Sequence, residues 1–107
     1  MAYAKEEVIS LIKRFTKEIA EIVHTDRVFL FGSYAKDNPD EYSDIDIAII
    51  SQDIDDGNYF ELKKKIFKKA IEVNSYIEPL CFSKEEFDND WLPIIPEIKR
   101  RGIEIKV

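Results

Sequence analysis

Apolar residues recur near the start of the chain at the three-and-four spacing of a helix with one buried stripe. A continuous apolar run, Val28-Phe29-Leu30-Phe31, comes next and has the length of a strand that is buried on both faces. This run ends at Gly32-Ser33. The pattern therefore predicts a helix over residues 4–24 and then a short buried strand. The apolar positions of the helix are Val8, Leu11, Ile12, Phe15, Ile19, Ile22 and Val23.

Alternating residues mark a second strand over residues 44–50, with Ile45, Ile47 and Ile49 on one face. A second helix is predicted over 58–73, and residues 76–82 predict a third strand. In that strand Pro79 lacks a backbone donor, which favours an edge position or a bulge. The buried stripe expected for the second helix consists of Leu62, Ile66, Phe67, Ala70 and Val73.

The C-terminal part of the chain predicts a helical region followed by a strand. Ser83-Lys84-Glu85-Glu86 has the form of a capping box, which marks a helix start. Pro93 and Pro96 interrupt this last helical region, and alternating residues at 103–107 predict the final strand. The order helix, strand, strand, helix, strand, helix, strand predicts an α/β (α+β) fold, with a mixed sheet of about four strands covered mainly by helices.

Length and charge narrow the possible functions. The 107 residues have room for one domain, expected to span 1–107. A net charge of −6 argues against general nucleic-acid binding, which requires a basic surface. No apolar segment approaches the roughly 20 residues that cross a bilayer, and no signal peptide is visible. With Cys81 as the single cysteine, a cytoplasmic protein without disulfides is expected.

Two carboxylates form the strongest chemical feature of the sequence. Asp44 and Asp46 are two residues apart on a predicted strand, so both project from the face opposite Ile45. Their mutual repulsion would disappear if a hard cation such as Mg²⁺ lay between them. The alternative is that Asp44 is a turn residue and Asp46 an exposed strand residue, with unrelated roles.

Gly32-Ser33 at the end of the buried strand adds a second feature. Glycine lets a phosphate approach the backbone, and serine offers a hydroxyl and an amide donor. The alternative is an ordinary turn at the end of a strand. A P-loop is excluded, because no second glycine precedes Lys36.

Together, Phe31-Gly32-Ser33 and Asp44-Ile45-Asp46-Ile47 resemble the signature of the DNA polymerase β-type nucleotidyltransferases. The longer stretch from Gly32 to Ile49 is similar to the minimal nucleotidyltransferases of bacteria and archaea. Where many minimal members have glycine, this chain has Asp37, which adds negative charge near the expected phosphate site.

The resemblance implies Mg²⁺-dependent transfer of a nucleoside monophosphate, AMP above all, from ATP or another nucleoside triphosphate to an acceptor hydroxyl. It implies that Asp44 and Asp46 hold one or two Mg²⁺ ions, and that a third carboxylate completes the site or acts as general base. Glu78 on the third predicted strand is the candidate, with a solvent-facing edge glutamate as the alternative. Gly32 and Ser33 would hold the β and γ phosphates, and Lys36 would add charge unless it is a plain loop lysine.

The resemblance also suggests a partner. Minimal members resemble the antitoxin half of a toxin–antitoxin pair, whose partner is a helical HEPN-domain ribonuclease. This chain is accordingly expected to modify such a partner, with a homo-oligomer as a further possibility. The alternative is a catalytically silent antitoxin of the same fold, which acts by forming a stoichiometric complex.

Overall fold

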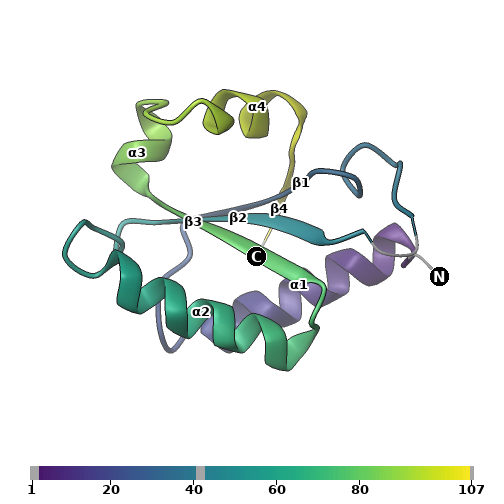
Figure 1. Ribbon diagram of the computed structural model, residues 1–107, viewed down its shortest axis with the longest axis horizontal. Coiled ribbons are helices and arrows are strands. Elements are labelled where there is room, and N and C mark those ends of the chain that lie inside the picture. The colour runs from purple at the N-terminus through teal and green to yellow at the C-terminus, as the bar shows by residue number, and fades with distance from the viewer. Residues whose placement is uncertain (1–2, 41–42, 107) are drawn as a thin grey trace.

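A computed structural model of the chain describes residues 3–40 and 43–106. Two layers of helices enclose a sheet, with α1 and α2 below it and α3 and α4 above it in the view of Figure 1. The elements along the chain are α1 (Lys5–Ile19), β1 (Arg27–Phe31), β2 (Ile45–Ser51), α2 (Tyr59–Val73), β3 (Ile77–Ser83), α3 (Lys84–Asp88), α4 (Ile94–Arg101) and β4 (Ile103–Ile105).

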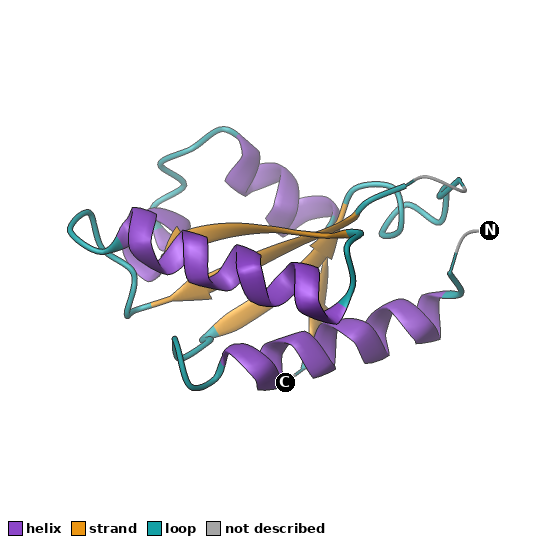
Figure 2. Ribbon diagram, turned by 60° about the horizontal axis from the view of Figure 1, so that its bottom comes forward, coloured by secondary structure: helices purple, strands orange, loops and turns teal. Residues whose placement is uncertain are grey.

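The sheet is mixed and four-stranded, as the sequence predicts. Its strand order is β3-β2-β1-β4. β1 runs antiparallel to both β2 and β4, whereas β2 and β3 are parallel and are connected by α2. Figure 2 shows this sheet with helices on both of its faces. Pro79 lies on β3, the edge strand, where its missing donor costs no ladder hydrogen bond.

Each face of the sheet has its own apolar core. Ile45, Ile47 and Ile49 point to the face that α1 and α2 cover, where they pack with Phe15. Ala48 and Ile50 point to the other face and join Phe29, Phe82 and Phe87 with the buried residues of α4. The predicted alternation along β2 is therefore confirmed, although both of its faces are buried.

Two details of the predicted helices are wrong. α1 ends at Ile19, because the chain turns there and Val23 bonds back to the Ile19 carbonyl at 2.9 Å. The turn still brings Val23 into the core, so the apolar spacing continues where the helix does not. Phe67 is 43% exposed, since Ile66 and Ala70 take the inward positions of α2.

The last helical region is two helices, not one. The capping box predicted at Ser83 begins α3, with the Glu86 amide donating to Ser83 Oγ at 3.0 Å. After α3 the chain reverses at Asp90, which has a φ of 52°. α4 then starts after Pro93, a residue suited to a helix N-terminus. In the described parts of the chain, no helix has both the length and the apolar character that crossing a bilayer requires.

Cys81 gives the fold a direct chemical test. It is 4% exposed on β3, and burial raises the pKa of its thiol to about 11. Because only the thiolate reacts, we expect the native protein at pH 8 to resist a thiol reagent such as dithionitrobenzoate. The unfolded chain in urea should react at once. Rapid labelling of the native protein would contradict the packing of β3.

Candidate active site

Three carboxylates converge where β2 and β3 begin. The parallel register sets Asp46 opposite Glu78, so both side chains project from the same face of neighbouring strands. Asp44 lies two residues before Asp46 and projects to the same side. Ligand oxygens of Asp44, Asp46 and Glu78 all lie within 4.8 Å of one another. In the described residues, these form the one acidic, histidine or cysteine group that could hold a metal ion.

The helices leave this corner of the sheet open. α3 packs on β2 and β3, and α4 packs on β1. Asp44 and Glu78 are exposed, while Asp46 is half-buried beside the end of β1, where it is the register partner of Phe31. A substrate could therefore reach the carboxylates from the side that carries α3 and α4.

The electrostatics of the cluster favour a bound cation. Burial raises the pKa of Asp46, and the charge of Asp44 raises it further. The pKa of Glu78 is raised mainly by a side-chain hydrogen bond to Asp44, and also by burial and by the charges of both aspartates. Each shift disfavours the ionised form, so the three groups resist carrying a full charge together. A hard divalent cation bound between the three groups would instead favour the ionised carboxylates.

Gly32 has a role at this site that sequence reasoning did not identify. Its φ is 72°, a left-handed conformation that suits glycine, and a Cβ built on it would overlap Oδ2 of Asp46. The glycine therefore gives the chain its turn and leaves room for the Asp46 carboxylate. The sequence had suggested only close approach of a phosphate.

The residues after Gly32 form one tight turn. The Lys36 amide donates to the Gly32 carbonyl at 3.2 Å, and the Asn38 amide donates to the Ser33 carbonyl at 2.9 Å. Asp37 adopts the left-handed conformation that glycine would favour there, with a φ of 55°. Its Oδ1 lies 2.6 Å from Lys5 Nζ, so its negative charge has a partner outside the turn.

A small cavity adjoins Gly32 on the α4 side. Its volume is about 140 Å³, and two cations, Lys36 and Arg101, line it together with Glu97. Arg101 Nε lies 3.7 Å from Glu97 Oε2. Arg101 was not identified from the sequence, because nothing in the spacing shows that α4 returns to the end of β1.

The donor set fits Mg²⁺. Three carboxylates offer the oxygen ligands that this ion prefers, and the adjoining corner is open for water and substrate phosphates to complete the coordination. The set contains no thiolate or imidazole, so it does not resemble a zinc or copper site.

Residues 12–104 match the family model described as the nucleotidyltransferase domain. The chain belongs to this family. It is 33% identical over 105 residues to a Methanocaldococcus jannaschii protein named as a candidate protein adenylyltransferase, in a match that covers 92% of this chain and 99% of that one. The chain is thus a nucleotidyltransferase, and the resemblance drawn from its two short motifs is confirmed.

Two crystal structures share the fold of this nucleotidyltransferase. One is a candidate nucleotidyltransferase from Sulfolobus solfataricus, with a TM-score of 0.62 and 23% identity over 79% of this chain and 75% of that one. The other is a mutant of the toxin–antitoxin pair MntA–HpeT, with a TM-score of 0.55 and 19% identity over 97% of this chain and 73% of that one. The predicted α/β fold with its mixed sheet is therefore confirmed.

Substituting Gly32 tests how the nucleotidyltransferase site is built. We expect Gly32→Ala to lower the free energy of unfolding by about 1–2 kcal/mol, because alanine disfavours a positive φ, with a further loss from the overlap with Asp46. Gly57→Ala is the matched control, since its φ is not in the left-handed region and a Cβ there would lie 3.3 Å from one flexible carboxylate. Urea unfolding measures both. A Gly32→Ala variant as stable as Gly57→Ala would contradict the turn geometry.

Proposed function

We propose that this nucleotidyltransferase transfers AMP from ATP to a hydroxyl group of a partner protein, in a reaction that depends on Mg²⁺. The observation that carries the proposal is the convergence of Asp44, Asp46 and Glu78 beside Gly32. Without a cation these carboxylates would repel a triphosphate, so a nucleotide substrate and a divalent ion are expected together. The name of the M. jannaschii relative supports AMP as the transferred group and a protein as the acceptor.

The three carboxylates would have different roles in the reaction. Asp44 and Asp46 would hold the metal and orient the α phosphate, and Glu78 would complete the metal site or accept the proton of the attacking hydroxyl. The acceptor oxygen then bonds to the α phosphorus while the bond to the leaving oxygen breaks and pyrophosphate departs with its electron pair. When bound, Mg²⁺ supplies charge neutralisation to the triphosphate and lowers the pKa of the acceptor hydroxyl.

The turn that begins at Gly32 would bind the departing phosphates. The Gly32 backbone and Ser33 would donate hydrogen bonds to the β and γ phosphates. Lys36 and Arg101, which line the same cavity next to Gly32, would add positive charge. The ion pair between Arg101 and Glu97 is long at 3.7 Å, so the guanidinium remains available to a phosphate.

The acceptor in this proposal is the toxin of a toxin–antitoxin pair. The fold neighbour MntA–HpeT is such a pair, and its structural match extends over 97% of this chain. By analogy this chain is the antitoxin, and its partner is a helical HEPN-domain protein. Residues 1–107 would act as a single domain, which contributes the nucleotide site while the partner brings the hydroxyl.

Mass spectrometry of the partner tests the reaction. The tagged nucleotidyltransferase is purified together with the protein that binds it, and the complex is incubated with ATP and Mg²⁺. We expect the partner to gain the mass of one or more AMP groups. Asp44→Asn and Glu78→Gln should slow this gain by about a hundredfold or more, because each removes a group that stabilises the transition state.

Asp56→Asn is the control, because Asp56 is an exposed acid outside the cluster and its substitution changes the net charge equally. Its rate should equal the wild-type rate. If Asp44→Asn also transfers AMP at that rate, the metal assignment is wrong. If the complex forms without any mass gain or Mg²⁺-dependent ATP consumption, the chain is the catalytically silent antitoxin that the sequence left as the alternative.

A further inference from the structure

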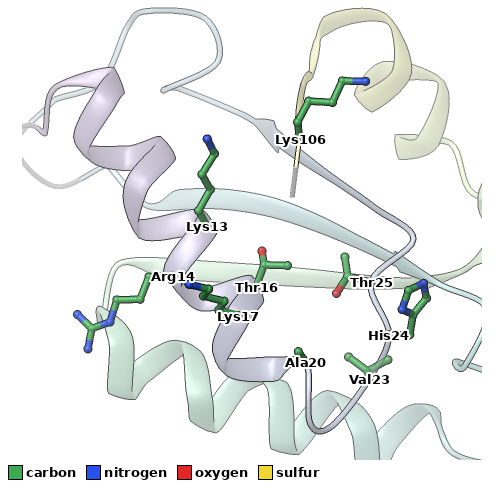
Figure 3. A pocket seen from close by; sticks show the side chains of 9 residues that line it. All are labelled: Lys13, Arg14, Thr16, Lys17, Ala20, Val23, His24, Thr25 and Lys106. Carbon is green, nitrogen blue, oxygen red and sulfur yellow. The ribbon is translucent and has the colours of Figure 1, made fainter.

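A second cavity lies at the other end of the sheet, between α1, the start of β1 and the end of β4 (Figure 3). Thr25 precedes β1 and lines this cavity, whereas Gly32 follows β1 at the catalytic corner. Gly32 is seven positions after Thr25 along a mostly extended segment, which separates the two residues by about 20 Å. The cavity is therefore distinct from the site of nucleotidyl transfer. Its volume of about 740 Å³ is in the range of about 300–1,000 Å³ that is usual for small-molecule sites.

The lining of the second cavity is basic in a chain that is acidic as a whole. Lys13 and Lys17 come from α1, and Lys106 follows β4. Figure 3 shows Lys13 on α1 and Lys106 at the end of β4, with Thr16 and Thr25 lower in the view. No ion pair joins these three lysines to any carboxylate in the parts of the chain that the structure describes.

Two acids that neighbour lining residues of this cavity are already engaged. Glu104 lies two residues before Lys106, but it accepts two hydrogen bonds from Arg27, at 2.9 and 3.0 Å. Asp26 Oδ1 lies 3.5 Å from the His24 ring, and its Oδ2 accepts from the Gln52 amide at 2.6 Å. Neither Glu104 nor Asp26 therefore pairs with the three lysines, which favours binding of an anion in this cavity.

Thr25 provides an independent sign of a ligand. Its hydroxyl oxygen is buried and has no hydrogen-bond partner, and it is the one buried side-chain polar atom in this condition in the described chain. Such a group costs free energy unless something bonds to it. The neighbouring Thr16 hydroxyl, by contrast, donates to the Ile12 carbonyl at 2.8 Å. Thr25 therefore offers an unused donor in the wall of a basic cavity.

We propose that this cavity between α1 and β4 binds a small organic phosphate, with Lys13, Lys17 and Lys106 around the phosphate group and Thr25 donating to one of its oxygens. A phosphate monoester carries nearly two negative charges and three acceptor oxygens, which suits several lysines and one hydroxyl. Ala20 and Val23 give the cavity an apolar surface against which the organic part packs.

An NMR titration with AMP in the presence of EDTA tests the site. Removing divalent cations weakens nucleotide binding at the carboxylates, and the Gly32 amide reports any residual binding there. We expect saturable shifts of the Thr25, Lys17 and Lys106 amides, while Gly32 stays unchanged. Inorganic phosphate should bind more weakly than AMP, because it cannot use the apolar surface.

Two variants identify the groups involved. Lys13→Ala/Lys106→Ala should weaken AMP binding by about tenfold or more, because it removes two charge-assisted hydrogen bonds. The matched control is Lys64→Ala/Lys68→Ala, which removes the same charge from exposed positions of α2 and should bind like the wild type. Thr25→Val should bind more weakly yet melt no lower than the wild type, because it deletes an unsatisfied buried hydroxyl.

Several results would overturn the proposal. In the titration, they are a lack of saturable shifts at Thr25, shifts centred on Gly32, or equal affinities for inorganic phosphate and AMP. In the variants, they are an equal loss of AMP affinity in the two double variants, or an unchanged AMP affinity in Thr25→Val. None of these results depends on whether the chain transfers AMP. The binding proposal for the second cavity is therefore tested independently of the proposed catalytic function.

Discussion

The parallel pairing of β2 with β3 determines where the three carboxylates meet. It sets Asp46 opposite Glu78, and a slip of one residue would turn Glu78 to the other face of the sheet. Apolar side chains hold the register, because Ile77 and Cys81 belong to the core under α1 and α2, whereas Phe82 belongs to the core under α3 and α4. The same packing that stabilises the fold therefore fixes the spacing of the acids.

This arrangement has an energetic cost that suits its chemistry. Oxygens of the three carboxylates lie within 4.8 Å of one another, and the raised pKa values of Asp46 and Glu78 show that these two groups resist ionisation there. Packing of two apolar cores offsets this cost, and Gly32 lets the chain turn without displacing Asp46. A site held in this way is organised before its ligands arrive, so little reorganisation is needed when charge develops during the reaction.

Much of this could be predicted from the sequence, because strand alternation is a local property. Asp44 and Asp46 are two residues apart on the predicted strand, which was enough to place both on one face. Pro79 indicated an edge position or a bulge, and β3 is the edge strand. The errors arise where tertiary contacts decide. The apolar spacing continues through Ile22 and Val23 although the chain turns after Ile19, so the end of α1 could not be read from the pattern.

The sequence could not predict that Arg101 lines the cavity next to Gly32, because this contact requires α4 to return to the end of β1. The basic cavity at Thr25 joins α1 to the residue after β4, which are almost a whole chain length apart. Sequence spacing carries no information about contacts of this kind. They follow from the sheet order, in which β4 pairs with β1 and not with β3.

We propose that one divalent cation is held by Asp44, Asp46 and Glu78. Anomalous diffraction from crystals soaked with Mn²⁺, an ion that shares the preference of Mg²⁺ for oxygen ligands, would locate this cation directly. We expect a strong anomalous peak between these three carboxylates, beside Gly32. A peak at the exposed acids Asp53, Asp55 and Asp56 instead, or full Mn²⁺ occupancy with Glu78 turned away, would contradict this assignment.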